Sequence, residues 1–132
     1  MYWWHAAAMI VGAKQARQFG LIATNSLSQS FNRQVVQAAF TGRSPISFAY
    51  AIADHPWVDS SDGAAVRIAM TVGRVGSACG TLAVIRQEAP LLDGSADIQL
   101  LERSGTIHAS LSIGADFAAT SQLRANAQLA LR

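Results

Sequence analysis

Three short segments hold the side chains best suited to contact a polar ligand or a nucleic acid. They combine amide, hydroxyl, guanidinium and rigid aromatic groups: Asn25, Ser26, Asn32, Arg33, Pro56 and Trp57. A rigid, exposed aromatic ring can stack on a base that has left its duplex, and a proline directly before it stiffens the backbone. Amide and guanidinium groups at the start of a helix can meet a phosphate. These residue types indicate recognition by contact and stacking.

Each segment also has a structural interpretation. Asn25 and Ser26 could cap the helix that follows them, and Asn32 and Arg33 could lie on its solvated face. Trp57 could fold back into the core beneath a hairpin. On the residues alone, both interpretations stay open.

Known catalytic and metal-binding motifs are missing from the sequence. There is no P-loop and no G-x-G-x-x-G, and the glycines between Gly73 and Gly80 follow a predicted strand at the wrong spacing. Asp54 and His55 are adjacent, so they cannot orient each other as in a catalytic triad. The three histidines are far apart and no C-x-x-C accompanies them: His5, His55 and His108. We therefore expect no catalytic residue, metal site or cofactor loop within this sequence.

Composition narrows the class of protein. Of the 132 residues, 51% are hydrophobic and 14% are charged, which is too apolar for a disordered chain. The net charge of +2 is mildly basic and does not by itself require nucleic acid. A single cysteine, Cys79, excludes an internal disulfide and fits a cytoplasmic compartment. No apolar run reaches the ~20 residues of a membrane span, and we expect no membrane partner.

Hydrophobic periodicity predicts helices and strands in alternation. A helix is expected at Trp3–Gln18, and a second one begins near a Ser28 or Ser30 cap and runs to Phe40. The nearly all-apolar run Phe19–Thr24 between them is typical of a strand buried on both faces.

The remaining elements are predominantly β. Ile46–Ala53 predicts a second buried strand, and Ala64–Val72 follows after a loop too short for a crossover helix, so the two should pair as an antiparallel hairpin. Thr81–Gln87 continues the β character, Ile98–Glu102 and Thr106–Leu111 are expected as short strands, and a polar or helical tail follows Asp116. The predicted fold is α/β: a partial Rossmann-like sheet of parallel strands with crossover helices that ends in an antiparallel β-hairpin.

Three collinear segments carry a family resemblance. YWWHAAAMIVGAKQARQFGLIATNSLSQSFNRQVV, ISFAYAIADHPWVDSSDGAAVRIAMTVG and GTIHASLSIGADFAATSQLRANAQL resemble the region after the catalytic motif in large bacterial adenine-specific DNA methyltransferases. These are class I, S-adenosylmethionine-dependent enzymes of restriction-modification and related defence systems. The resemblance covers nearly the whole chain, in the family's order.

The resemblance implies methyl transfer from S-adenosylmethionine to the N6 atom of an adenine flipped out of duplex DNA. It assigns Trp57 and Pro56 to a loop beside that base and Asn25 and Ser26 to a strand end nearby, with Asn32 and Arg33 structural or near DNA. The family's glycine-bearing cofactor loop and Asn-Pro-Pro-Tyr/Phe loop do not occur here.

Residues 1–88 are accordingly expected to be the second half of a methyltransferase catalytic domain, and residues 89–132 a connector toward a missing target-recognition region. The chain opens on aromatic residues, which favours a piece of a longer enzyme, inactive alone, whose first half another chain could supply. The alternative hypothesis is a non-catalytic DNA- or protein-binding α/β module.

Overall fold

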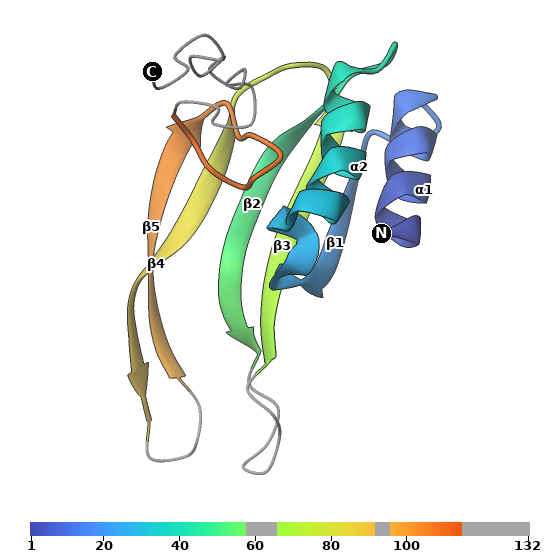
Figure 1. Ribbon diagram of the computed structural model, residues 1–132. Coiled ribbons are helices and arrows are strands. Elements are labelled where there is room, and N and C mark those ends of the chain that lie inside the picture. Colours follow the sequence, from blue (N-terminus) through green and yellow to red (C-terminus); the bar gives the residue numbers. More distant parts are fainter. Residues whose placement is uncertain (58–65, 92–95, 115–132) are drawn as a thin grey trace, which may run out of the picture.

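The computed structural model describes residues 1–57, 66–91 and 96–114. Within these ranges two helices and a short 3-10 turn combine with five strands (Figure 1). In chain order the elements are α1 (Tyr2–Gly12), β1 (Gln18–Thr24), η1 (Asn25–Ser28), α2 (Ser30–Thr41), β2 (Ile46–Trp57), β3 (Val66–Val75), β4 (Gly80–Pro90) and β5 (Ala96–Gly105). Neither α-helix in the described ranges is long and apolar enough to span a bilayer.

The five strands form one sheet in the order β1-β3-β2-β4-β5. β3 is antiparallel to both β1 and β2, β2 is parallel to β4, and β4 is antiparallel to β5. The predicted hairpin of β2 and β3 is confirmed. The fold is mixed α/β, as expected, but the sheet is mostly antiparallel and β2 and β4 are its one parallel pair in the described residues, so it is not specifically Rossmann-like. The strand β3 lies between β1 and β2. Apolar runs predict that a strand is buried, but they do not say which strand lies beside it.

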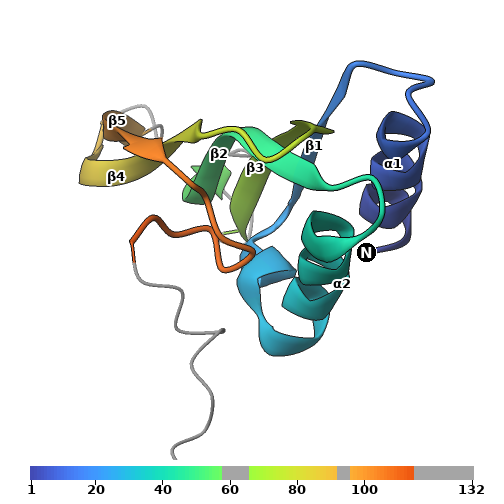
Figure 2. The same cartoon turned by 90° about the horizontal axis from the view of Figure 1, so that it is seen from above.

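Both helices cover the same face of the sheet (Figure 2). Trp4 is the centre of this packing: its ring contacts Phe19 and Phe48 edge to face, at centroid distances of 5.4 and 6.0 Å. Its indole Nε1 donates a hydrogen bond of 3.3 Å to Oγ1 of Thr71, a buried polar residue of β3. Phe40 of α2 contacts Phe48 from the other side, at 5.0 Å. These rings join α1, α2, β1 and β2, and the hydrogen bond of Trp4 adds β3 to the same core.

The first helix ends earlier than predicted. Instead of reaching Gln18, α1 stops at Gly12, and the chain turns through Lys14, whose φ of 60° is left-handed. The Gln15 N–H donates to the Ile10 carbonyl at 3.1 Å and closes this turn. Gln18 then pairs with Arg74 in the sheet. Strand pairing with β3 therefore overrides the helical pattern of these residues.

The second helix lacks the predicted side-chain cap. Gln29 is the N-cap residue and no side-chain cap bond forms, because Ser28 instead donates to the Asn25 carbonyl at 3.2 Å. Phe31, near the start of α2, is 78% exposed, whereas Val36 is fully buried. A 3-10 turn rather than a side chain therefore leads into α2.

The outer strands also differ from expectation. β1 alternates between exposed and half-buried residues, so the prediction of burial on both faces is wrong: β1 lies at the edge of the sheet. The two strands predicted at Thr81–Gln87 and Ile98–Glu102 are confirmed and are longer, as β4 and β5. Thr106–Leu111 is not a strand; it turns back over the helix-covered face, where Ile107, Ala109 and Leu111 are buried (Figure 2). The tail expected after Asp116 lies outside the described residues.

Candidate functional site

The candidate site lies where β1 and β2 both end, at one end of the sheet (Figure 1). Here a network of polar side chains crosses four strands. Arg67 of β3 donates from Nε to Oδ1 of Asp54 in β2 at 2.7 Å and from Nη1 to Oε2 of Glu88 in β4 at 3.1 Å. Asn25, directly after β1, donates from Nδ2 to the same Asp54 oxygen at 3.3 Å. We call Asn25, Asp54, Arg67 and Glu88 the four-strand polar network.

A β-bulge places Asp54 in this network. β2 pairs with β3 at Ile52↔Met70 and again at His55↔Ile68, so Ala53 and Asp54 together face one residue, Ala69. Such a bulge bends its strand and re-aims a side chain. It allows the Asp54 carboxylate to meet Arg67, which lies opposite Pro56.

The expected loop around Pro56 is part of a strand. Pro56 and Trp57 pair with Arg67 and Val66 as the last residues of β2. A proline is tolerated here because the pairing of β2 with β4 ends at Ile52↔Ala83, so its missing N–H breaks no ladder bond toward β4. His55 Nδ1 lies 2.8 Å from the Pro56 carbonyl oxygen. Strand pairing therefore fixes the backbone under Trp57 more firmly than a loop would.

Trp57 is 47% exposed at this end of the sheet. Side chains of paired residues lie on the same side of a sheet, and successive residues alternate. Trp57 pairs with Val66 and Pro56 pairs with Arg67. Trp57 therefore lies on the open face, opposite the helices, while Pro56 and Arg67 lie on the helix-covered face.

The remaining predicted residues join the loop between β1 and α2. The hydroxyls of Ser26 and Thr24 are 2.6 Å apart, and Asn32 Nδ2 donates to the Ser26 carbonyl at 3.0 Å. Arg33 is half-buried, and its backbone N–H donates to the Gln29 carbonyl at 2.8 Å. Ser26 and Asn32 thus hold the start of α2 against the end of β1, close to Asn25.

Charge pairing governs the electrostatics of the network. The hydrogen bond from Arg67 is the largest cause that lowers the pKa of Asp54, assisted by the bond from Asn25. The same bond raises the pKa of Arg67 further above its already high value. The side chains of Arg67, Asp54 and Glu88 are 35%, 50% and 37% exposed, so solvent screens these pairs. With two carboxylates on its guanidinium, Arg67 is not free to bind a phosphate.

Sequence reasoning missed Arg67 and Glu88 and did not join Asp54 to Asn25. A signal was present: Arg67 interrupts an otherwise apolar strand, and a charge in such a place needs a partner. The partners themselves come from separate strands, and only the sheet order brings them together.

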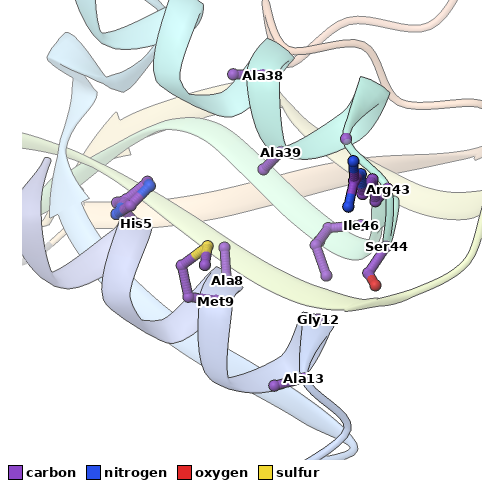
Figure 3. Close-up of a pocket in the computed structure, with 11 residues that line it drawn as sticks. His5, Ala8, Met9, Gly12, Ala13, Ala38, Ala39, Arg43, Ser44 and Ile46 are labelled. Carbon is purple, nitrogen blue, oxygen red and sulfur yellow. The ribbon is translucent and has the colours of Figure 1, made fainter.

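A pocket of ≈ 380 Å³ lies between α1 and α2, and its lining includes Ile46 at the start of β2 (Figure 3). Its described lining consists mainly of alanine, glycine and other apolar residues, with His5, Arg43 and Ser44 as the polar side chains. Recognition of a nucleoside ribose commonly uses a carboxylate, and this lining contains none. Among the described residues, no three His, Cys, Asp or Glu side chains gather to hold a metal ion.

Comparison with known proteins gives a match in structure alone. No protein-family model and no curated protein matches the sequence. A solved structure of a Type IIL restriction-modification enzyme, MmeI, in complex with DNA matches with a TM-score of 0.59 and 16% identity. The match covers 86% of this chain but 14% of that one. At this identity the match shows a shared fold, and the chain corresponds to a small part of the larger enzyme.

Proposed function

We propose that this chain is the DNA-contacting, trailing part of an adenine-specific DNA methyltransferase. Another polypeptide supplies the S-adenosylmethionine pocket and the Asn-Pro-Pro-Tyr/Phe loop, and the substrate is DNA in the cytoplasm. The observation that carries the proposal is Trp57, a half-exposed indole at the carboxyl end of β2 with its backbone fixed by strand pairing. In open α/β sheets, ligands bind beyond the carboxyl ends of the strands.

The fold supports this proposal at a coarser level. β1 and β2 run in the same direction with the antiparallel β3 between them, and α2 connects them on one face. The same fold occurs in part of a restriction-modification enzyme solved with DNA. The sequence resemblance includes the residues around Trp57. Together with it, these features favour a role in DNA modification.

Within this function each described residue has a limited role. The Trp57 ring stacks on the flipped adenine and shields it from water. The Asp54–Arg67 pair is a positioning element, since it locks the bulge three residues before Trp57. S-adenosylmethionine, when bound by the partner, supplies the methyl group. No described residue is assigned a proton transfer or nucleophilic attack.

The test uses a DNA duplex with one unpaired adenine, which lowers the cost of extruding the base. Fluorescence anisotropy would measure its affinity for the chain. Because stacking contributes about 1–3 kcal/mol per base, Trp57→Ala should weaken binding about 5- to 150-fold. Trp57→Phe should retain most of the affinity. Trp3→Ala is the matched control, since Trp3 is 77% exposed but lies on α1.

Equal affinities of the wild-type chain and the Trp57→Ala variant would reject the stacking role. A duplex without the unpaired adenine separates stacking from general attraction to phosphates, which falls steeply with salt. If the Trp57 effect is the same on both duplexes, the ring does not read an extruded base.

The alternative function is a non-catalytic DNA- or protein-binding module. It is favoured by one observation, namely that the glycine-bearing cofactor loop and the Asn-Pro-Pro-Tyr/Phe loop do not occur in the sequence. An assay of methyl transfer with the chain and its partner together distinguishes the two functions. The methyltransferase proposal expects N6-methyladenine in the DNA, whereas the module does not.

A further inference from the structure

We infer that His55 is a specificity-determining residue, whose Nε2 atom accepts a hydrogen bond from the exocyclic amino group of the base that stacks on Trp57. The inference rests on the proposed function for the presence of that base. The acceptor itself is argued from the place of His55 in the sheet, its tautomer and its free ring nitrogen.

His55 and Trp57 lie on the same face of the sheet. They are two residues apart in β2, so their side chains leave the strand on one side, about 6.6 Å apart along it. Their partners in β3, Ile68 and Val66, show the same spacing. His55 therefore stands beside the Trp57 ring on the open face, and strand pairing fixes the backbone of both residues.

One hydrogen bond sets the tautomer of the His55 ring. Nδ1 lies 2.8 Å from the carbonyl oxygen of Pro56. A carbonyl oxygen can only accept, so Nδ1 must carry the hydrogen. In a neutral imidazole the other nitrogen is then an acceptor. The same bond orients the ring, because it ties Nδ1 to the backbone of the residue between His55 and Trp57.

The remaining nitrogen of His55 is available to a ligand. Within the described ranges, the Nδ1 contact is the hydrogen bond of this side chain, and Nε2 has no partner. The fully buried polar atoms without a partner in these ranges are Ser47 Oγ and Arg74 Nε, so Nε2 of the half-buried His55 reaches solvent. Ile68 and Val66, across the strand pair, are apolar and offer it no hydrogen bond.

An acceptor at this place selects among bases by their amino groups. Adenine presents the N6 amino group, which donates, at the edge of its ring. The amino group has two hydrogens, so a bond to His55 leaves the second free for another contact. A base without the amino group stacks on Trp57 through the same kind of ring but leaves Nε2 without a donor.

The test compares two DNA duplexes that differ by this amino group alone. Each carries one unpaired base, either adenine or unsubstituted purine, which lowers the cost of extrusion. Fluorescence anisotropy at mildly alkaline pH, where an imidazole is neutral, measures the affinity of the chain for each. We expect the adenine duplex to bind about 2- to 12-fold more tightly, which corresponds to one net hydrogen bond.

Two substitutions separate the nitrogens of the ring. His55→Asn keeps an N–H at the position of Nδ1 but has no atom at that of Nε2, and it should bind both duplexes equally. His55→Gln carries an acceptor at the distance of Nε2 and should retain part of the preference for adenine. His5→Asn is the control, since His5 is an exposed histidine of α1, and it should behave as the wild-type chain does. Circular dichroism and melting temperatures show that each variant is folded.

The outcomes distinguish this inference from the function on which it rests. Equal affinities of the wild-type chain for the two duplexes, or a full preference for adenine in His55→Asn, would overturn the role of His55. The stacking role would stand in either case if Trp57→Ala weakened binding to both. Absence of binding to either duplex, or no effect of Trp57→Ala, would reject the proposed function and the inference with it.

Discussion

The helix-covered face of the sheet and its open face come from the same apolar strands, yet the chain covers them unequally. On the first face Phe48 and Ala69 are 1% and 0% exposed beneath α1 and α2. On the second face Ile22 and Trp57 remain 57% and 47% exposed. An apolar strand sequence thus predicts that both faces of the strand are covered, but it does not show that the same chain covers both. We propose that the helix-covered face provides most of the stability and that the open face around Trp57 provides recognition.

The largest expected effect breaks the covered face. Phe48→Ala removes a ring at the junction of Trp4 and Phe40 and should lower the free energy of unfolding by about 3–5 kcal/mol. Urea denaturation measures this change. Phe31→Ala is the matched control, since Phe31 is 78% exposed, and it should stay within about 0.5 kcal/mol of the wild-type chain. Similar losses for both variants would contradict the assignment of the core.

A smaller effect is expected where β4 approaches β2. A Cβ on Gly80 would meet the carbonyl oxygen of Phe48 and lie 2.8 Å from that of Ala49, so Gly80→Ala forces the backbones apart. We expect a loss of about 1–3 kcal/mol in thermal or urea unfolding. Gly20→Ala, whose added Cβ would lie 4.0 Å from the nearest atom, Val72 Cγ2, should cost less. A larger loss of stability for Gly20→Ala than for Gly80→Ala would contradict the close approach of β4 to β2.

The four-strand polar network should contribute less than the core. Arg67→Ala removes ion pairs with Asp54 and Glu88 that are partly screened by solvent, so we expect a loss of about 0.5–1 kcal/mol. Arg103→Ala, an exposed arginine of β5, serves as the control in the same urea assay. A loss equal to that of Phe48→Ala would show that the network, rather than the rings, holds the sheet together.

The smallest effect is a dependence of stability on pH. Because the folded state lowers the pKa of Asp54, this carboxylate stabilises the fold above its unfolded pKa, whose ordinary value is 3.8. The contribution is lost as the pH falls from there through the lowered folded pKa. Unfolding free energies of the wild-type chain and Asp54→Asn should therefore differ at pH 7 and converge in acid. A constant difference between pH 7 and pH 2 would argue against the pairing.

Much of the local structure could be predicted from the sequence. The strand at Phe19–Thr24, though not its burial on both faces, and the hairpin of β2 and β3 were predicted correctly, because these patterns are set by neighbouring residues. The end of α1, the place of β3 between β1 and β2, and the turn after Thr106 could not be predicted, since each depends on pairing between distant segments.

In the candidate site too, residues marked by local sequence could be predicted, and residues that depend on distant segments could not. Asn25 and Trp57 were identified because polar and aromatic residues stand out after apolar runs. Arg67 was not identified, because its place in the site depends on its hydrogen bonds with Asp54 and Glu88, which belong to two other strands. The roles of the predicted site residues in DNA contact remain predictions for experiment.

We propose that the chain contacts DNA and that a partner binds the methyl donor. Paired calorimetric titrations of the chain alone test it most directly, one with a duplex that carries an unpaired adenine and one with S-adenosylmethionine. We predict saturable binding of the duplex, weakened by Trp57→Ala, and no heat of binding for the cofactor at millimolar concentration. Tight cofactor binding, or a duplex that does not bind, would contradict the claim.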